Sequence, residues 1–158
     1  MKFIDMTYYD ALSTVPLFKD FEPSELRKLA MCASRLDFDA DAIIYHAGEL
    51  GKGLYIVQQG RVAIEMDLGD QGIVPLYMLG PGELFGWSSL IQGRRKKARA
   101  RAAEPAGLLF LDIEQIRDFT RYDYKFSDAL MNCVIGVIAE RMYLTRERLA
   151  RHTARMRV

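Results

Sequence analysis

The chain has 158 residues and a formal net charge of +1, because its 22 lysines and arginines are balanced by 21 aspartates and glutamates. Half of the residues are hydrophobic and 27% are charged, which is typical of one globular domain with an additional element. This balance excludes a domain that is basic throughout, and with it a domain-wide positive field for nucleic acid.

Residues 1–34 have a helical pattern. Pro23 suits the first position of a helix, and Glu25 suits its first turn. Apolar residues then recur at the spacing of one helical face. We predict a helix that ends near Ser34, preceded by a further short helix within residues 1–14.

Residues 35–111 change to the pattern of a β-domain. Short runs of strand-forming residues alternate with turn residues, which is typical of a sandwich or barrel. Gly60 marks a tight hairpin, and Pro75 inside a run indicates an edge strand or a bulge. The predicted strands cover Arg35–Phe38, Ile43–His46, Leu54–Gln58, Val62–Met66, Val74–Leu79, Ala98–Ala103 and Leu108–Leu111.

The stretch 80–103 combines a glycine-rich turn with positive charge. Its three leading glycines are followed by Trp87, two serines and a basic run between Arg94 and Arg101. A glycine-rich turn lets backbone N–H groups approach a ligand, and arginine and lysine side chains supply charge for phosphate. The stretch therefore predicts an anion-binding cassette.

Residues 112–158 return to a helical pattern. Asp112, with Gln115 three residues later, predicts the cap of a short helix over Ile113–Phe119. Ser127 predicts the start of a longer helix, whose basic tail after Leu149 we expect to fray. Its wide apolar face indicates contact with the β-domain on one side and with a partner helix on the other. This face has two neighbouring stripes, Met131, Ile135, Ile138, Met142 and Leu149, and Leu130, Val134, Val137 and Leu144.

The sequence offers little for catalysis, metal binding or membrane insertion. The start has no apolar core of signal-peptide length, and the longest mainly apolar stretch is too short to span a bilayer. Cys32 and Cys133 give neither a disulfide framework nor a zinc spacing. No Ser-His-Asp or Cys-His arrangement suggests itself, and His46 and His152 have no ligand partners nearby. We expect a cytoplasmic, non-enzymatic protein without a metal and without membrane attachment.

Four motifs occur in a characteristic order: PLFKDFEPSELRKLA, GLYIVQQGRVAI, GPGELFGWSSL and LLFLDIEQI. They resemble the opening helix, the central hairpin, the start of the phosphate-binding cassette and the final strand of cyclic nucleotide-binding domains of the catabolite activator type. The resemblance implies a mainly β fold with flanking α: a β-roll, or jelly-roll-like double-stranded β-helix, with N-terminal helices and a long C-terminal dimerisation helix. On this reading one domain comprises residues 1–34, 35–111 with the cassette at 80–103, and 112–158.

The resemblance also implies a ligand cavity between the β-roll and the long helix. In the family, a glutamate after a Phe-Gly pair holds the ribose hydroxyl of the nucleotide. Phe85 and Gly86 match that pair here, but Trp87 stands at the position of the glutamate. Losing a carboxylate–hydroxyl hydrogen bond costs about 1.5–3 kcal/mol of binding free energy. The indole could stack on a ligand, or it could fill the cavity and pack on the roll.

In the family, an arginine followed by Ser or Thr and then Ala holds the cyclic phosphate. The arginine position falls on Lys96, with Lys97 at the hydroxyl position and Ala98 as the alanine. A shift of one residue would put Lys97 and Ala98 at the first two positions. Either alignment replaces a forked guanidinium with an ammonium group. The ligand implied is a cyclic nucleotide or another small anion, and the other candidate contacts are Ser88, Ser89, Arg141 and Thr145.

Two classes of function follow from these patterns. The first is a ligand-sensing regulatory module that forms a homodimer through the helix at 127–150, with a degenerate cassette. The alternative is a protein-interaction or dimerisation module that has lost nucleotide binding, in which the serines cap a short helix and the basic run is solvated. A weaker interpretation is electrostatic contact of the basic run with an acidic partner or nucleic acid. The chain ends at Val158 without a winged helix-turn-helix, so we do not expect sequence-specific DNA binding.

Overall fold

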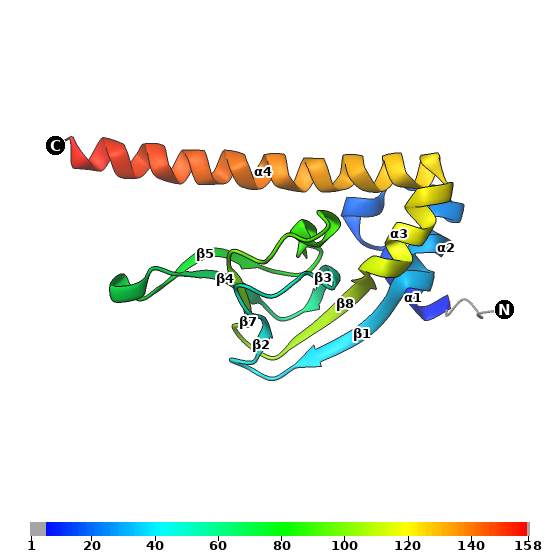
Figure 1. The fold of residues 1–158 in the computed structure, drawn as a ribbon, viewed down its shortest axis with the longest axis horizontal. Helices are drawn as coiled ribbons and strands as arrows, with labels where there is room; N and C mark the ends of the chain where they lie inside the picture. The colour runs from blue at the N-terminus through cyan, green and yellow to red at the C-terminus, as the bar shows by residue number, and fades with distance from the viewer. Residues whose placement is uncertain (1–5, 158) are drawn as a thin grey trace.

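Two antiparallel sheets form a roll in the computed structural model, which describes residues 6–157 (Figure 1). Each sheet contains four strands. The architecture confirms the expected mainly β fold of jelly-roll type. The strands are β1 (Ala33–Phe38), β2 (Ile43–Tyr45), β3 (Gly53–Gln59), β4 (Val62–Asp67), β5 (Ile73–Leu79), β6 (Leu84–Phe85), β7 (Arg99–Ala102) and β8 (Ala106–Asp112).

The strand order is β1-β8-β3-β6 in one sheet and β2-β7-β4-β5 in the other. Every predicted run overlaps one of these strands, whereas β6 lies outside the predicted runs because two residues are too few to show an alternation. Pro75 lies on the edge strand β5, opposite a register shift between Ile64 and Glu65 of β4. This position confirms the inference drawn from the proline, because an edge strand tolerates the missing N–H.

The helices gather at one end of the roll, except for a long helix that runs along its side (Figure 1). A short helix within residues 1–14 is confirmed, although residues 1–5 lie outside the described part of the chain. The helices are α1 (Met6–Ser13), α2 (Pro23–Cys32), α3 (Ile113–Tyr122) and α4 (Tyr124–Met156), with short 3-10 segments η1 (Pro16–Phe18), η2 (Gly69–Gln71) and η3 (Trp87–Leu90).

Four predicted helix boundaries are wrong. Helix α3 ends at Tyr122 instead of Phe119. Helix α2 ends at Cys32 instead of near Ser34, because β1 already pairs with β8 from Ala33 onward. Helix α4 starts at Tyr124 instead of Ser127, because the Asp123 carboxylate caps it by accepting a hydrogen bond of 3.1 Å from the Phe126 N–H. The tail that we expected to fray is helical to Met156. The Asp112 cap of α3 is confirmed, since its carboxylate accepts from the Gln115 N–H at 3.0 Å.

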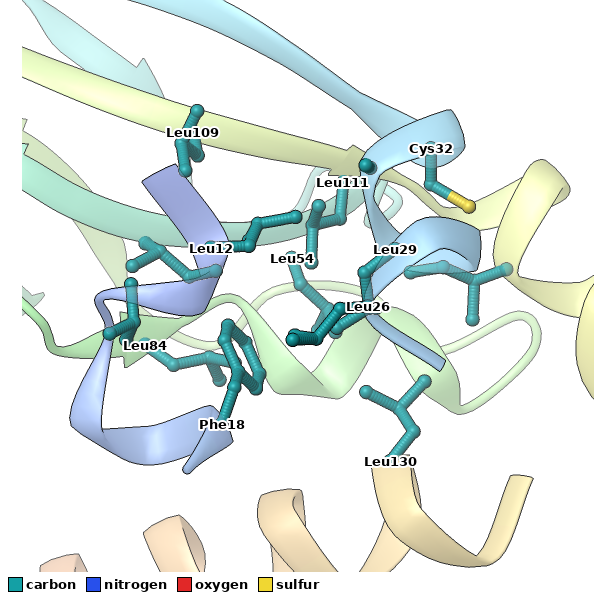
Figure 2. Packing of buried hydrophobic residues seen from close by; sticks show 14 of the residues in the cluster. Leu12, Phe18, Leu26, Leu29, Cys32, Leu54, Leu84, Leu109, Leu111 and Leu130 are labelled. Carbon is teal, nitrogen blue, oxygen red and sulfur yellow. The ribbon is translucent and has the colours of Figure 1, made fainter. Parts of the chain in front are cut away.

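The buried side chains form two clusters. One fills the roll between the sheets and includes Tyr55, Ile64, Phe85 and Leu108. The other joins the helices to the end of the roll, where Leu29 and Phe18 pack beside Leu54, Leu84 and Leu111 (Figure 2). Leu130 of α4 reaches this second cluster from the opposite side (Figure 2). Helix α4 is therefore anchored by its N-terminal part.

Beyond this anchor, α4 presents large apolar side chains to solvent. Ile135, Met142, Leu149 and Met156 are between 48% and 74% exposed. Their spacing of seven residues places them on one side of the helix. Among residues 6–157, no helix has the combination of length and apolar character that a membrane span requires.

Candidate anion-binding cavity

Gly86 sets the direction of the chain at the start of the cassette. It follows β6 and adopts φ 80°, in the left-handed region, where it caps η3. A Cβ atom at this position would lie 2.9 Å from Cδ2 of Tyr55 and 3.0 Å from the carbonyl oxygen of Gly53. The missing side chain therefore lets the cassette lie directly on β3.

Lys96 turns into the roll because its backbone is anchored on both sides. Its carbonyl accepts a hydrogen bond from the Gly48 N–H at 2.7 Å, and its own N–H donates to the Glu49 carbonyl at 2.8 Å. Both partners lie in the turn after β2. The side chain is 5% exposed, whereas that of Lys97 is exposed at the mouth of the site. Of the two possible alignments, the structure places Lys96 inside.

The ammonium group of Lys96 is surrounded by neutral groups. Its Nζ donates to the carbonyl of Gly86 at 3.1 Å and to the hydroxyls of Ser88 and Ser89 at 3.0 Å each. It also lies 4.7 Å from the ring centroid of Tyr45. No carboxylate within residues 6–157 forms an ion pair with it. Burial lowers the pKa of Lys96 from 10.5 to about 8.

The two serines differ in what they can offer to a ligand. Ser89 is 2% exposed, and its hydroxyl donates to the Gly53 carbonyl at 2.9 Å while it accepts from Lys96. Ser88 is half-buried and lines the cavity. Ser89 therefore holds the cassette together, while Ser88 remains accessible to a ligand.

A cavity of about 260 Å³ lies between the cassette, β4, β5 and α4. Phe85 forms part of its wall and stacks on Tyr55, with ring centroids 4.9 Å apart. Trp87 also lines the cavity, and it packs against the helical cluster described above. The sequence-predicted residues in the wall are Phe85, Gly86, Trp87, Ser88, Lys96, Lys97, Ala98 and Arg141, whereas Ser89 and Thr145 lie outside it.

Arg141 brings α4 to the cavity. Its guanidinium lies 5.8 Å from the ring centroid of Tyr77 on β5 and donates a hydrogen bond to the Leu84 carbonyl. Burial lowers the pKa of Arg141, and the nearby Glu83 partly opposes this effect. One turn further along, the Thr145 hydroxyl lies 2.5 Å from the Tyr77 hydroxyl. Tyr77 thus holds α4 against the roll at the cavity.

Some residues of the wall were expected only as part of the basic run, and others were not predicted as site residues. Arg94 and Arg95 belong to the basic run and are exposed at the mouth, where Arg95 donates to the Gly48 carbonyl at 2.8 Å. Tyr45 and Tyr77 sit in predicted strands, and only the pairing of those strands shows that they face the cassette. The other wall residues that were not predicted are Ile64, Met66 and Leu76.

The chemistry of this site favours an anion. A buried ammonium lies at the floor, a guanidinium comes from α4, and aromatic rings form the wall. Burial also raises the pKa of Tyr45, so that its hydroxyl stays neutral beside Lys96. Residues 6–157 contain no group of three or more His, Cys, Asp or Glu side chains placed to hold a metal ion.

Comparison with known proteins gives a consistent result. The family described as the cyclic nucleotide-binding domain matches residues 35–123. The chain is 37% identical over 97 residues to the cyclic AMP receptor protein of Thermus thermophilus, covering 61% of this chain and 44% of that protein. It is 30% identical over 108 residues to the type II regulatory subunit of cAMP-dependent protein kinase of Drosophila melanogaster, covering 68% and 28%. The matched region is thus less than half of each relative.

Solved structures agree with the fold. The catabolite activator protein of Thermus thermophilus has a TM-score of 0.70 and 29% identity, over 87% of this chain and 63% of that one. A cyclic nucleotide-binding domain from Methylobacillus flagellatus has a TM-score of 0.80 and 20% identity, over 93% and 83%. The second likeness concerns the fold alone.

Proposed function

We propose that this chain, which belongs to the cyclic nucleotide-binding domain family, is a regulatory module that senses a small anionic ligand. The ligand binds in the cavity between the cassette and α4, and a change in α4 reports its presence. The module is not an enzyme, and it acts in the cytoplasm.

One observation carries this proposal: the Lys96 ammonium is buried at the floor of a cavity with only neutral partners. A buried charge is costly unless a counter-charge or strong hydrogen bonds compensate it. A bound anion would supply that counter-charge. The arrangement therefore favours a ligand with a negative group at the floor of the cavity.

Helix α4 connects the cavity to the surface that we propose for dimerisation. Arg141 lines the cavity, and its neighbour Met142, about 100° further around the helix, belongs to the exposed apolar row. A ligand that contacts Arg141 would shift the position of α4 relative to the roll. We propose that two copies pair through residues 127–150, and the apolar row extends this surface to Met156.

The experiment is a calorimetric titration of the full chain with cyclic AMP and cyclic GMP, supported by melting temperatures. We expect Lys96→Met to weaken binding by at least about tenfold, since it removes the buried charge. Lys97→Met is the matched control, because it removes an exposed charge one residue away and should weaken binding less than Lys96→Met does. Equal losses in the two variants would contradict the assignment of Lys96 as the phosphate contact.

A second candidate function is a protein-interaction module that has lost nucleotide binding. Trp87 favours it, because the indole lines the cavity and is half-buried against the helical cluster. The open cavity beside Lys96 counts against it. No heat and no shift in melting temperature with millimolar cyclic AMP, cyclic GMP or cyclic dinucleotides would favour this second function.

A further inference from the structure

We propose that the cavity selects a ligand with at least two negative charges on phosphate-type groups over one with a single charge. This inference rests on the proposed function, because it concerns the ligand of the same site. It depends on the number and placement of the charges around the cavity.

The cavity wall contains five cationic side chains and no carboxylate: Arg94, Arg95, Lys96, Lys97 and Arg141. A single negative charge can lie against Lys96 at the floor. The exposed cations of the wall would then still face no carboxylate within it, whereas Glu83 already acts on Arg141 from outside the wall. Opposite charges attract by about 1 kcal/mol at 4 Å even in water, and by more near a protein surface. A second negative group on the ligand would therefore be stabilised further.

The cations lie at two depths. Lys96 is buried, Arg141 is half-buried on α4, and Arg94 and Lys97 are exposed at the mouth. A phosphate with two negative charges at the floor would be attracted by Lys96 at close range and by the cations at the mouth from further away. The aromatic wall of Tyr45, Tyr77, Phe85 and Trp87 suits a planar ring system beside this phosphate.

Nearby carboxylates do not cancel this charge at the wall. Glu83 accepts a hydrogen bond from the Gly80 N–H at 2.7 Å, and it influences Arg141 without lining the cavity. Glu49 acts on Tyr55, and it too lies outside the wall. The cavity surface itself is therefore uniformly positive among its charged groups.

The test compares ligands that share a base and differ in charge. The full chain is titrated by calorimetry at pH 7.5 with adenosine, cyclic AMP and AMP, and with the guanine counterparts. AMP carries nearly two charges at this pH because its second phosphate pKa is about 6, whereas cyclic AMP carries one. We expect AMP to bind about tenfold more tightly than cyclic AMP at low salt. The advantage should shrink at about 0.5 M salt, where charges are screened.

A pair of variants locates the effect. Arg94→Gln/Lys97→Gln removes two charges from the mouth and should reduce the advantage of AMP to less than about threefold. Arg27→Gln/Arg61→Gln is the matched control, because it removes two exposed charges that do not line the cavity. This control should keep the advantage.

The outcomes separate the two proposals. If cyclic AMP binds as tightly as AMP, or if the advantage survives in Arg94→Gln/Lys97→Gln, the selection for a second charge is overturned and the anion site stands. If none of these compounds binds at millimolar concentration, the proposed sensing function is overturned, and the charge selection falls with it.

Discussion

The guanidinium of Arg117, on α3, donates a hydrogen bond of 3.2 Å to the carbonyl of Ser89, on η3. Ser89 also holds the Lys96 ammonium through its hydroxyl. The same arginine pairs with Glu114 at 2.6 Å. Because α3 leads directly into α4 through Asp123, this contact connects the floor of the cavity to the base of the long helix.

Replacing Arg117 should loosen that connection. We expect Arg117→Met to lower the free energy of unfolding by about 1 kcal/mol, because it removes a partly exposed hydrogen bond from a charged donor. Urea denaturation measures the change. Arg121→Met, on the same helix at an exposed position, is the control and should change stability by less than about 0.5 kcal/mol. Equal effects would show that the contact with Ser89 contributes nothing.

A side chain at Gly86 should destabilise the cassette. Gly86→Ala combines a left-handed backbone with contacts of 2.9 and 3.0 Å to Tyr55 and Gly53, and we expect a loss of about 2–4 kcal/mol. Gly93→Ala isolates the backbone contribution, because Gly93 has φ 76° and nothing within 4 Å of a Cβ. Gly93→Ala should lower the free energy of unfolding by about 1–2 kcal/mol. Thermal or urea unfolding distinguishes the two, and equal losses would contradict the close approach.

The stability of the chain should depend on pH through Lys96. Its pKa is about 8 in the folded chain and 10.5 in the reference state. Between these values the unfolded chain binds more protons than the folded chain, so the free energy of unfolding rises with pH. We expect the stability of the native chain relative to Lys96→Met to increase from pH 7.5 to pH 9.5, measured by urea denaturation. A constant difference would show that Lys96 is not desolvated.

Anion affinity should change with pH in the opposite direction. An anion favours the charged form of Lys96, so the affinity for AMP should be constant between about pH 7 and pH 8 and fall above pH 8, by at most tenfold per pH unit. Calorimetry with AMP at pH 7 and pH 9 measures this fall. Binding at pH 9 should also take up protons, which appears as an enthalpy that depends on the buffer. In Lys96→Arg any residual binding should lose this dependence, since arginine stays charged.

The apolar row on α4 should hold a dimer together. We expect light scattering after size exclusion to give about twice the chain mass of 18.1 kDa. Met142→Lys places a charge in the row and should shift the protein toward the monomer. Gln71→Lys, exposed at the tip of the β4–β5 hairpin, is the control for the added charge. A native chain that elutes as a monomer would remove the dimer from the proposal.

The sequence by itself determined the order of the elements and the type of fold. Strand runs with alternating burial follow from the period of a β-strand, as in β7, where the buried Ala100 and Ala102 alternate with Arg99 and Arg101. The Asp112 cap and the Gly60 turn are equally local, because each depends on a few neighbouring residues. The start of α4 was not predicted, since Asp123 competes with Ser127 as a cap and the sequence does not rank them.

Only the tertiary structure decided which cation lies inside the cavity. Lys96 and Lys97 are adjacent and chemically identical, and the sequence allowed either one. Hydrogen bonds from Gly48 and to Glu49, almost fifty residues earlier in the chain, fix the backbone of Lys96 so that its side chain points inward. The position of Arg141 at the cavity also depends on tertiary packing, because it requires α4 to be anchored at Leu130 and held against the roll by Tyr77. A local pattern cannot encode such contacts, because their partners are distant in sequence.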